Sequence, residues 1–247
     1  MMKTTKLTIS IGLLIILGLV FYWYFPRTPV AFPSDKELIE NMNDTQTTIR
    51  VEKIRDKIKI DEEHFFVPFI STTGDYGTSY WEWQNTKWKV LNIDNSGEPK
   101  VWKIDSRDPS TFRLVWNLHE DDKVDHMKLF LNRERNFHVT NGVEYYYPKL
   151  QMEKRVETAS VSYGTMKLPN DWLSVIESLI KMDSVASPDL FGDFDLNRHM
   201  YFAWKPYDKS GIEARLEGTI NGYSFFNDDI ELDLVRLMDD SYFETSH

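Results

Sequence analysis

Residues 119–126 (HEDDKVDH) carry side chains that could bind a metal ion. Imidazole and carboxylate together are a common ligand set for zinc and other transition metals. Because apolar residues alternate on both sides of this segment, the sequence predicts a hairpin whose mouth brings His119, Asp122 and His126 together. A solvated acidic turn is the competing interpretation, since zinc motifs space their ligands more tightly and Lys123 offsets part of the charge.

Three tryptophans, Trp81, Trp83 and Trp88, form a second candidate site. Together with Trp102 and Trp116, they could make a flat ligand-binding platform on which sugar rings stack, as would suit a domain that faces a cell wall. The alternative is that these large side chains fill the inward face of a sheet, which is the commoner use of such residues. The sequence leaves both interpretations open and favours the second.

The sequence predicts no catalytic residue and no cofactor. It lacks Gly-x-Ser-x-Gly, and the pair Gly74 and Gly77 is not followed by the lysine of a phosphate loop. Residues 193–197 (DFDLN) imitate the start of a calcium loop, but Arg198 stands where that loop needs glycine and Trp204 where it needs glutamate. The absence of cysteine removes disulfides, zinc thiolates and thiol nucleophiles together.

The elements that would position these residues are mainly β-strands. A hairpin with the two-residue loop Asn85-Thr86 would pair Trp83 with Trp88, although Thr86 is poorly suited to the positive φ of a tight turn, which favours a longer loop. Alternation over residues 112–118 predicts a strand buried on one face. The other strands expected in this antiparallel meander cover residues 64–71, 100–104, 127–131, 137–140 and 143–147.

Helices are expected on both sides of the meander. Ser34 and Glu37 match a capping box, which predicts a short helix directly after Ser34. A second helix is expected from Asn170 and a third where Ile230, Leu234, Leu237 and Met238 share a helical face.

Three stretches between these helices also carry strand signals. Residues 47–60 are ambiguous, because Val51, Ile54 and Ile58 also fit a helix face, and we favour strands at both ends. Further strands are expected over residues 200–205 and 213–220. Pro68 lacks the N–H that a ladder needs, so residues 64–71 should form an edge strand or a bulged one.

Residues 7–25 (LTISIGLLIILGLVFYWYF) predict a single transmembrane helix. At about 1.5 Å per residue this run covers roughly 28 Å, close to the thickness of the hydrocarbon core, and its aromatic end suits the headgroup layer. Lys3 and Lys6 place the N-terminus in the cytoplasm and the remainder outside. A cleaved signal peptide is the alternative, but the run is long and lacks small residues at a cleavage site.

The net charge of the chain excludes some classes of binding partner. The net charge is −10, and every acidic residue follows the apolar run, as do all basic residues except Lys3 and Lys6. Such an acidic outer part argues against nucleic acid and against electrostatic adhesion to anionic lipid. The expected organisation is a cytoplasmic tip (1–6), the transmembrane helix (7–25), a proline-rich stalk (26–33) and an extracytoplasmic α+β domain (34–247).

The sequence therefore predicts an α+β protein of the cell membrane, in which a mainly antiparallel β meander or sandwich packs against a few helices. Its expected function is that of a non-enzymatic binding or accessory module at the cell envelope, with the lipid bilayer and another membrane or envelope protein as partners. The alternative is a wall-directed hydrolase, metal-assisted if the histidine segment binds an ion.

Overall fold

The computed structural model of the chain describes residues 29–140, 143–186, 200–220, 224–226 and 230–238, together with Leu14. Within these residues no helix has both the length and the apolar character needed to cross a membrane. The predicted transmembrane segment, residues 7–25, lies outside the described residues apart from Leu14. The calcium-loop-like residues 193–197 also lie outside them.

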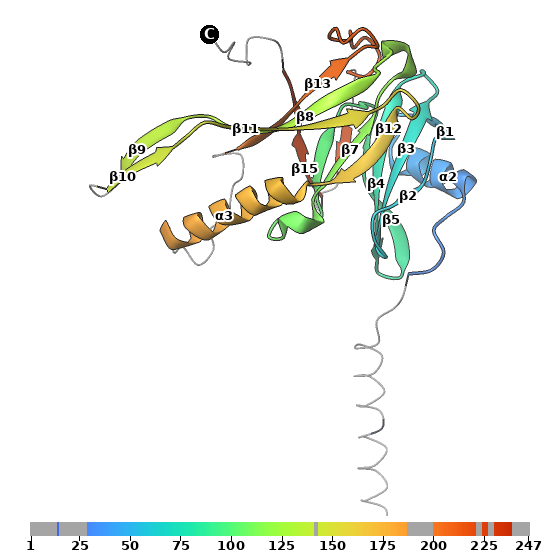
Figure 1. Cartoon of the computed structure of the whole chain (residues 1–247). Helices are drawn as coiled ribbons and strands as arrows, with labels where there is room; N and C mark the ends of the chain where they lie inside the picture. Colours follow the sequence, from blue (N-terminus) through green and yellow to red (C-terminus); the bar gives the residue numbers. More distant parts are fainter. Residues whose placement is uncertain are drawn as a thin grey trace, which may run out of the picture.

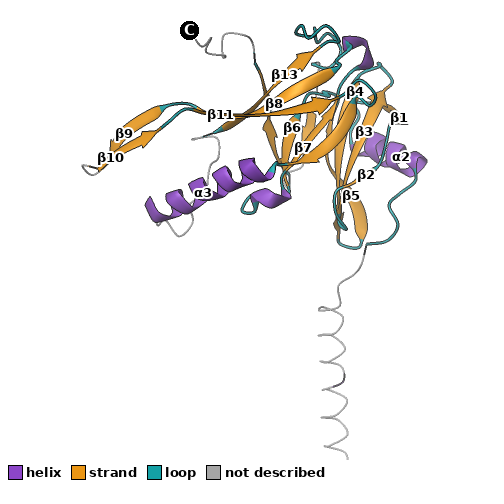
Figure 2. Cartoon of the chain, viewed as in Figure 1, coloured by secondary structure: helices purple, strands orange, loops and turns teal. Residues whose placement is uncertain are grey.

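The described part is a β-rich α+β fold, as the sequence predicts (Figures 1 and 2). The first sheet has the order β1-β3-β4-β5-β14 with β2 beside β3. Its strands are β1 (Val51–Ile54), β2 (Ile58–Lys59), β3 (His64–Ser71), β4 (Tyr76–Gln84), β5 (Lys87–Asp94) and β14 (Ser224–Phe226). The second sheet, in order, contains β12 (Tyr163–Lys167), β7 (Arg113–Asn117), β6 (Lys100–Lys103) and β15 (Glu231–Leu234).

The third sheet contains, in order, β11 (Leu150–Glu157), β8 (His126–Arg133), β13 (Tyr201–Tyr207) and β16 (Arg236–Leu237). A hairpin of β9 (Asn136–Thr140) and β10 (Val143–Tyr147) projects beyond β8 and β11 (Figure 1). The described helices are α2 (Asp35–Thr45), α3 (Asn170–Ala186) and the 3-10 turns η1 (Pro109–Thr111) and η2 (Glu120–Asp122).

The second sheet lies in the middle of the core. Leu114 and Trp116 of β7 pack into a cluster shared with the third sheet and α3. Val115, between them, packs with Tyr80 and Trp102 in a cluster shared with the first sheet. The strand is therefore buried on both faces, not on one, because layers cover it from both sides.

Helix α2 covers the opposite face of the first sheet. Its capping box is present: the Glu37 N–H donates to Ser34 Oγ, and the Ser34 N–H donates to Glu37 Oε2 at 2.8 Å. Leu38 and Met42 are fully buried against a cluster that includes Trp81. The capping-box prediction is thus confirmed, and the helix holds one face of the sheet away from water.

The β4–β5 hairpin has the predicted register. Trp83 pairs with Trp88 and the loop is the two residues Asn85-Thr86, with φ of 50° and 69°. The longer loop expected for Thr86 is therefore wrong, because the threonine adopts a positive φ. The predicted β9–β10 pairing is confirmed as well, although the turn residues Asn141 and Gly142 lie outside the described residues.

Strand β3 is an interior strand, which corrects the expectation of an edge. It pairs with β4 along one side and with β1 and β2 along the other. The Pro68 carbonyl accepts a hydrogen bond from the Arg55 N–H at 2.9 Å. The N and C=O of one strand residue point to the same side, so the missing N–H of Pro68 faces the break between β1 and β2, where no ladder bond is lost.

The C-terminal part differs from its prediction. Residues around Leu234 and Leu237 form β15 and β16 instead of a helix. Alternate residues Glu231 and Asp233 both reach the ammonium of Lys103, at 2.9 and 2.8 Å. Pairing with β6 therefore favours a strand over the helix that the leucine spacing predicts. Residues 214–220 form a loop after a single bridge at Glu213, so the strand predicted for 213–220 is wrong as well.

The predicted stalk is partly docked on the domain. Phe32 stacks on Phe65 with a centroid distance of 3.9 Å and meets the ring of Trp88 edge-on at 4.9 Å. The Trp88 indole N–H donates to the Val30 carbonyl at 3.0 Å. Residues from Val30 onward therefore belong to the packed structure, although the sequence places the start of the domain at Ser34.

Candidate functional site

A large hollow lies around η2, at one end of the layered sheets. It has a volume of about 780 Å³ and is lined by Arg55, by residues 118–120 and 123–125 around η2, by residues 158–163 from the end of β11 to the start of β12, and by residues 208–210 after β13. A second hollow of about 750 Å³ lies on the other side of η2 and shares His119, Lys123 and Asp208 with the first. We call the first hollow the η2 groove.

Asp122 fixes one wall of this region. Its Oδ1 accepts the backbone N–H groups of Glu217 and Gly218 at 2.9 and 3.0 Å. Its Oδ2 accepts the N–H of Thr219 at 3.0 Å and also the Thr219 hydroxyl. The buried carboxylate thus accepts the backbone hydrogen bonds of residues 217–219 that a neighbouring strand would otherwise accept. Both of its oxygens are used in these hydrogen bonds.

His119 is held tightly beside that loop. Its Nδ1 accepts the Asp121 N–H at 3.2 Å, which leaves the ring proton on Nε2. The imidazole packs on the Tyr76 ring at 4.3 Å. A Cβ at Gly218 would lie 2.5 Å from His119 Cγ, so this close approach requires glycine.

His126 is separated from His119 by the sheet arrangement. The β7–β8 hairpin predicted to join them does not exist, because β7 belongs to the second sheet and β8 to the third. The His126 ring stacks on Tyr207 at 5.0 Å, and its Nδ1 lies 3.1 Å from Asp125 Oδ2. Across the part of the chain that the structure describes, no three His, Asp or Glu residues form a group that could hold a metal ion.

Arg55, directly after β1, joins the first sheet to the η2 groove, and no pattern in the sequence predicts this role. Its guanidinium donates to Asn117 Oδ1 at 2.8 Å and to Ser162 Oγ at 3.0 Å, and it forms an ion pair with Glu120. Its partners are far away in sequence, so no local pattern could identify it.

The same guanidinium lies over two aromatic rings. The Tyr76 and Tyr163 rings are each 4.6 Å from Arg55 Cζ, an arrangement that favours a cation between them. Burial raises the pKa of Tyr76, and the nearby Glu120 carboxylate raises it further. Arg55 is therefore a rigid clamp that links three segments of the wall.

The acidic side chains of the groove are engaged internally. Glu120 pairs with Arg55, Asp125 contacts His126, and Asp208 accepts the N–H groups of Ser210 and Ile212 at 2.8 and 3.0 Å. The two lysines of the groove are exposed, and within the described residues neither Lys123 nor Lys209 forms an ion pair. Lys123 is held in the left-handed region at φ 50°. The groove therefore exposes two lysines that have no ion-pair partner within the described residues, while its acids are held by other contacts.

The three candidate tryptophans lie at the other end of β4. Trp81 and Trp88 are 0% and 7% exposed, and Trp83 is half-buried against the same cluster. Trp81 donates its indole N–H to Ser79 Oγ at 3.0 Å. Two of the three rings therefore lack an open face for a sugar, and the core interpretation is confirmed for Trp81 and Trp88.

Helix α3 carries one further motif whose residue types could do chemistry. Ser178 and Lys181 have the Ser-x-x-Lys spacing of some nucleophiles, and both lie on α3. The Ser178 hydroxyl is exposed and donates to the Ser174 carbonyl one turn earlier at 2.6 Å. It therefore makes a helix back-bond in this structure and lines neither hollow at η2.

No protein-family model, no curated protein and no solved structure matches this chain.

Proposed function

We propose that the protein is a membrane-anchored binding module of the cell envelope whose η2 groove holds an acidic peptide segment of another membrane or envelope protein. Residues 7–25 would span the membrane, with the N-terminus in the cytoplasm and the folded domain outside. The observation that carries the groove assignment is its pair of exposed lysines: Lys123 and Lys209 line the hollow without ion-pair partners among the described residues, whereas the acids of the lining are held by Arg55, His126 and backbone N–H groups.

The walls of the groove support a preformed site. Arg55 fixes one wall through hydrogen bonds to Asn117 and Ser162, and Asp122 ties η2, whose Glu120 lines the groove, to residues 217–219, so little ordering of the walls remains to occur on binding. Ligand pockets typically measure about 300–1,000 Å³, and the groove volume of about 780 Å³ lies in this range.

The residues that line the groove between β11 and β12 support a peptide as the ligand. Residues 158–162 (TASVS) carry mostly small side chains, which allow a ligand to approach the main chain closely. Thr158 is itself engaged with the Val124 carbonyl, at 2.9 Å. Peptides are commonly held by such backbone contacts together with a few charges that fix their direction.

A wall-directed hydrolase has less support. Among the described residues, neither imidazole near the groove hydrogen-bonds to a serine or threonine hydroxyl: His119 Nδ1 takes a backbone N–H, and His126 Nδ1 faces Asp125. Nucleophilic catalysis needs such a pair of nucleophile and base.

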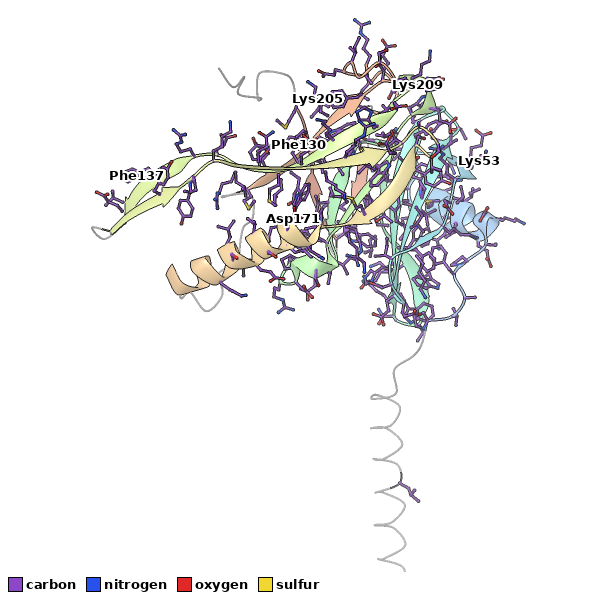
Figure 3. All side chains as sticks on the ribbon, in the orientation of Figure 1. Lys53, Phe130, Phe137, Asp171, Lys205 and Lys209 are labelled. Atoms are coloured by element: carbon purple, nitrogen blue, oxygen red, sulfur yellow. The ribbon has the colours of Figure 1, made fainter. Side chains whose placement is uncertain are left out.

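The proposal is tested with the full-length protein in detergent and a fluorescein-labelled hexaglutamate peptide, followed by anisotropy. We expect saturable binding that weakens as salt rises, and loss of binding in the Lys123→Glu, Lys209→Glu double variant. The control is Lys53→Glu, an exposed lysine on the edge strand β1 that does not line the groove (Figure 3). Equal binding by the double variant and the control would contradict the groove assignment.

A further inference from the structure

The docked residues fix where the folded domain begins. The Val30 carbonyl is bound by the Trp88 indole at 3.0 Å, and Phe32 lies among Phe65, Trp81 and Trp88 with centroid distances of 3.9 to 5.9 Å. We call these four rings, Phe32, Phe65, Trp81 and Trp88, the aromatic seat. The chain is therefore attached to the domain at Val30, beside the start of β5.

Little chain is left between this point and the predicted transmembrane helix. Only residues 26–29 separate Phe25 from Val30, and two of them are prolines. At most about 3.6 Å per residue, these residues cover roughly 14 Å. Each headgroup layer is about 5–8 Å thick, so the seat lies close to the headgroups if residues 7–25 cross the membrane.

The β4–β5 tip, residues 84–87, lies beside the seat. Asn85, Thr86 and Lys87 are exposed, and Trp83 next to the tip is half-buried. Figure 1 shows the turn of this hairpin next to the point where the described chain begins. Polar turn residues, an amphipathic indole and a long lysine side chain all suit a headgroup layer.

Strand β4 sets the distance from the tip to the η2 groove. Its first residue, Tyr76, contacts His119 and Arg55 at the groove, and its last, Gln84, lies at the tip. At about 3.3 Å per residue the strand covers roughly 26 Å between the two. Figure 3 shows Lys209 of the groove at the end of the molecule opposite the start of the described chain.

We propose that the β4–β5 tip rests on the lipid headgroup layer of the membrane that holds residues 7–25, so that the η2 groove faces away from the bilayer. This inference rests on the membrane anchor of the proposed function. Charge does not drive the contact, because the domain is acidic; the short tether does, by raising the effective concentration of lipid at the tip. The groove would then receive a ligand from the side away from the membrane.

The absence of cysteine allows a direct test. Thr86→Cys at the tip and Ser210→Cys at the groove are each labelled with one fluorophore in the full-length protein, which is reconstituted into phosphatidylcholine vesicles. Spin-labelled headgroup lipid is the quencher. We expect several-fold stronger quenching at residue 86 than at residue 210, in the population whose domain faces the outside.

A matched pair of variants tests the role of docking. In the Thr86→Cys protein, Phe32→Ala removes the ring that stacks on Phe65, and quenching should fall towards the value at residue 210. Val30→Ala keeps the carbonyl that Trp88 binds, and its side chain is 62% exposed, so quenching should not change.

The outcomes separate the two proposals. A full-length protein that fails to float with the vesicles would contradict the anchor, and the headgroup contact with it. A protein that floats but shows equal quenching at residues 86 and 210, or stronger quenching at 210, would overturn the headgroup contact while the anchor stands. Unequal quenching that persists unchanged in Phe32→Ala would show that the docked stalk does not hold the tip.

Discussion

The two ends of β4 are built by different physics. At the β4–β5 tip, the aromatic seat is held by ring contacts and area burial, with one indole hydrogen bond to Val30. At the η2 groove, Arg55, Asn117 and Asp122 hold loops together through hydrogen bonds to buried polar groups. Apolar packing stabilises in proportion to area, whereas a polar network holds its shape only while every member is paired.

This difference separates stability from function. Loss of a ring at the seat should lower the free energy of unfolding while the groove keeps its geometry. Loss of a polar anchor at the groove should cost less stability but weaken ligand binding, because η2 or the segment that Arg55 holds loses its attachment. The following changes, from the largest expected effect on stability to the smallest, test this contrast.

Trp81→Ala should have the largest effect. The ring is fully buried under α2, and such truncations cost about 3–5 kcal/mol. The measurement is chemical denaturation of the protein in detergent. Trp83→Ala is the matched control on the same strand, and it should cost clearly less because its ring is only half-buried. Equal losses would show that burial does not set the stability of the seat.

Asp122→Ala should come next, at about 2–3 kcal/mol, because three backbone N–H groups lose a charged acceptor. It should also weaken binding of the hexaglutamate peptide, since η2, whose Glu120 lines the groove, loses its attachment to residues 217–219. Asp121→Ala, at the neighbouring position, is the control. The Asp121 side chain is 94% exposed, so stability and binding should hardly change. Peptide affinity that is unchanged in Asp122→Ala would show that η2 is held in place by other contacts.

Arg55→Lys keeps the charge but should cost about 1–2 kcal/mol, because an ammonium cannot serve Asn117, Ser162 and Glu120 at once or stack between two rings. Peptide affinity should fall with it. Arg50→Lys, at an exposed guanidinium with one backbone contact, is the control that should leave both unchanged. Thermal melting and anisotropy give the two readouts.

His64 gives the smallest effect, through pH. Burial alone would lower its pKa, but hydrogen bonds and charges from Asp61 and Glu82 outweigh it and raise the pKa to about 9. The folded pKa exceeds the unfolded value of about 6.5, so the stabilisation is complete below about pH 6.5 and is lost as pH rises through about 9. Discounted for solvent screening, the loss is roughly 1 kcal/mol. A His64→Gln protein should lack this decline in stability with rising pH. An identical decline in the variant would show that another group causes it.

Local features of the fold could be predicted from the sequence. The β4–β5 register follows from pairs such as Trp83 with Trp88, the first helix from Ser34 and Glu37, and the second from the apolar face that includes Trp172. Each depends on residues only a few positions apart, where geometry is fixed by the chain itself.

Features that depend on distant partners could not be predicted. Leu234 and Leu237 fit a helical spacing, and only Lys103 on β6 reveals that Glu231 and Asp233 share a strand face. The same limit explains the histidine segment, since nothing local shows that β7 and β8 join different sheets. It also explains Arg55, whose partners Asn117 and Ser162 lie 62 and 107 residues away.

The central claim is that the η2 groove, not the β4–β5 tip, meets a protein partner. The most direct measurement places a photo-crosslinking amino acid at Ser160 in one protein and at Thr86 in another, both expressed in their own membrane. We predict a protein adduct at residue 160 that disappears when Lys123 and Lys209 are changed to glutamate, and only lipid adducts at residue 86. A protein adduct at residue 86, or one at residue 160 that survives the charge reversal, would contradict the account.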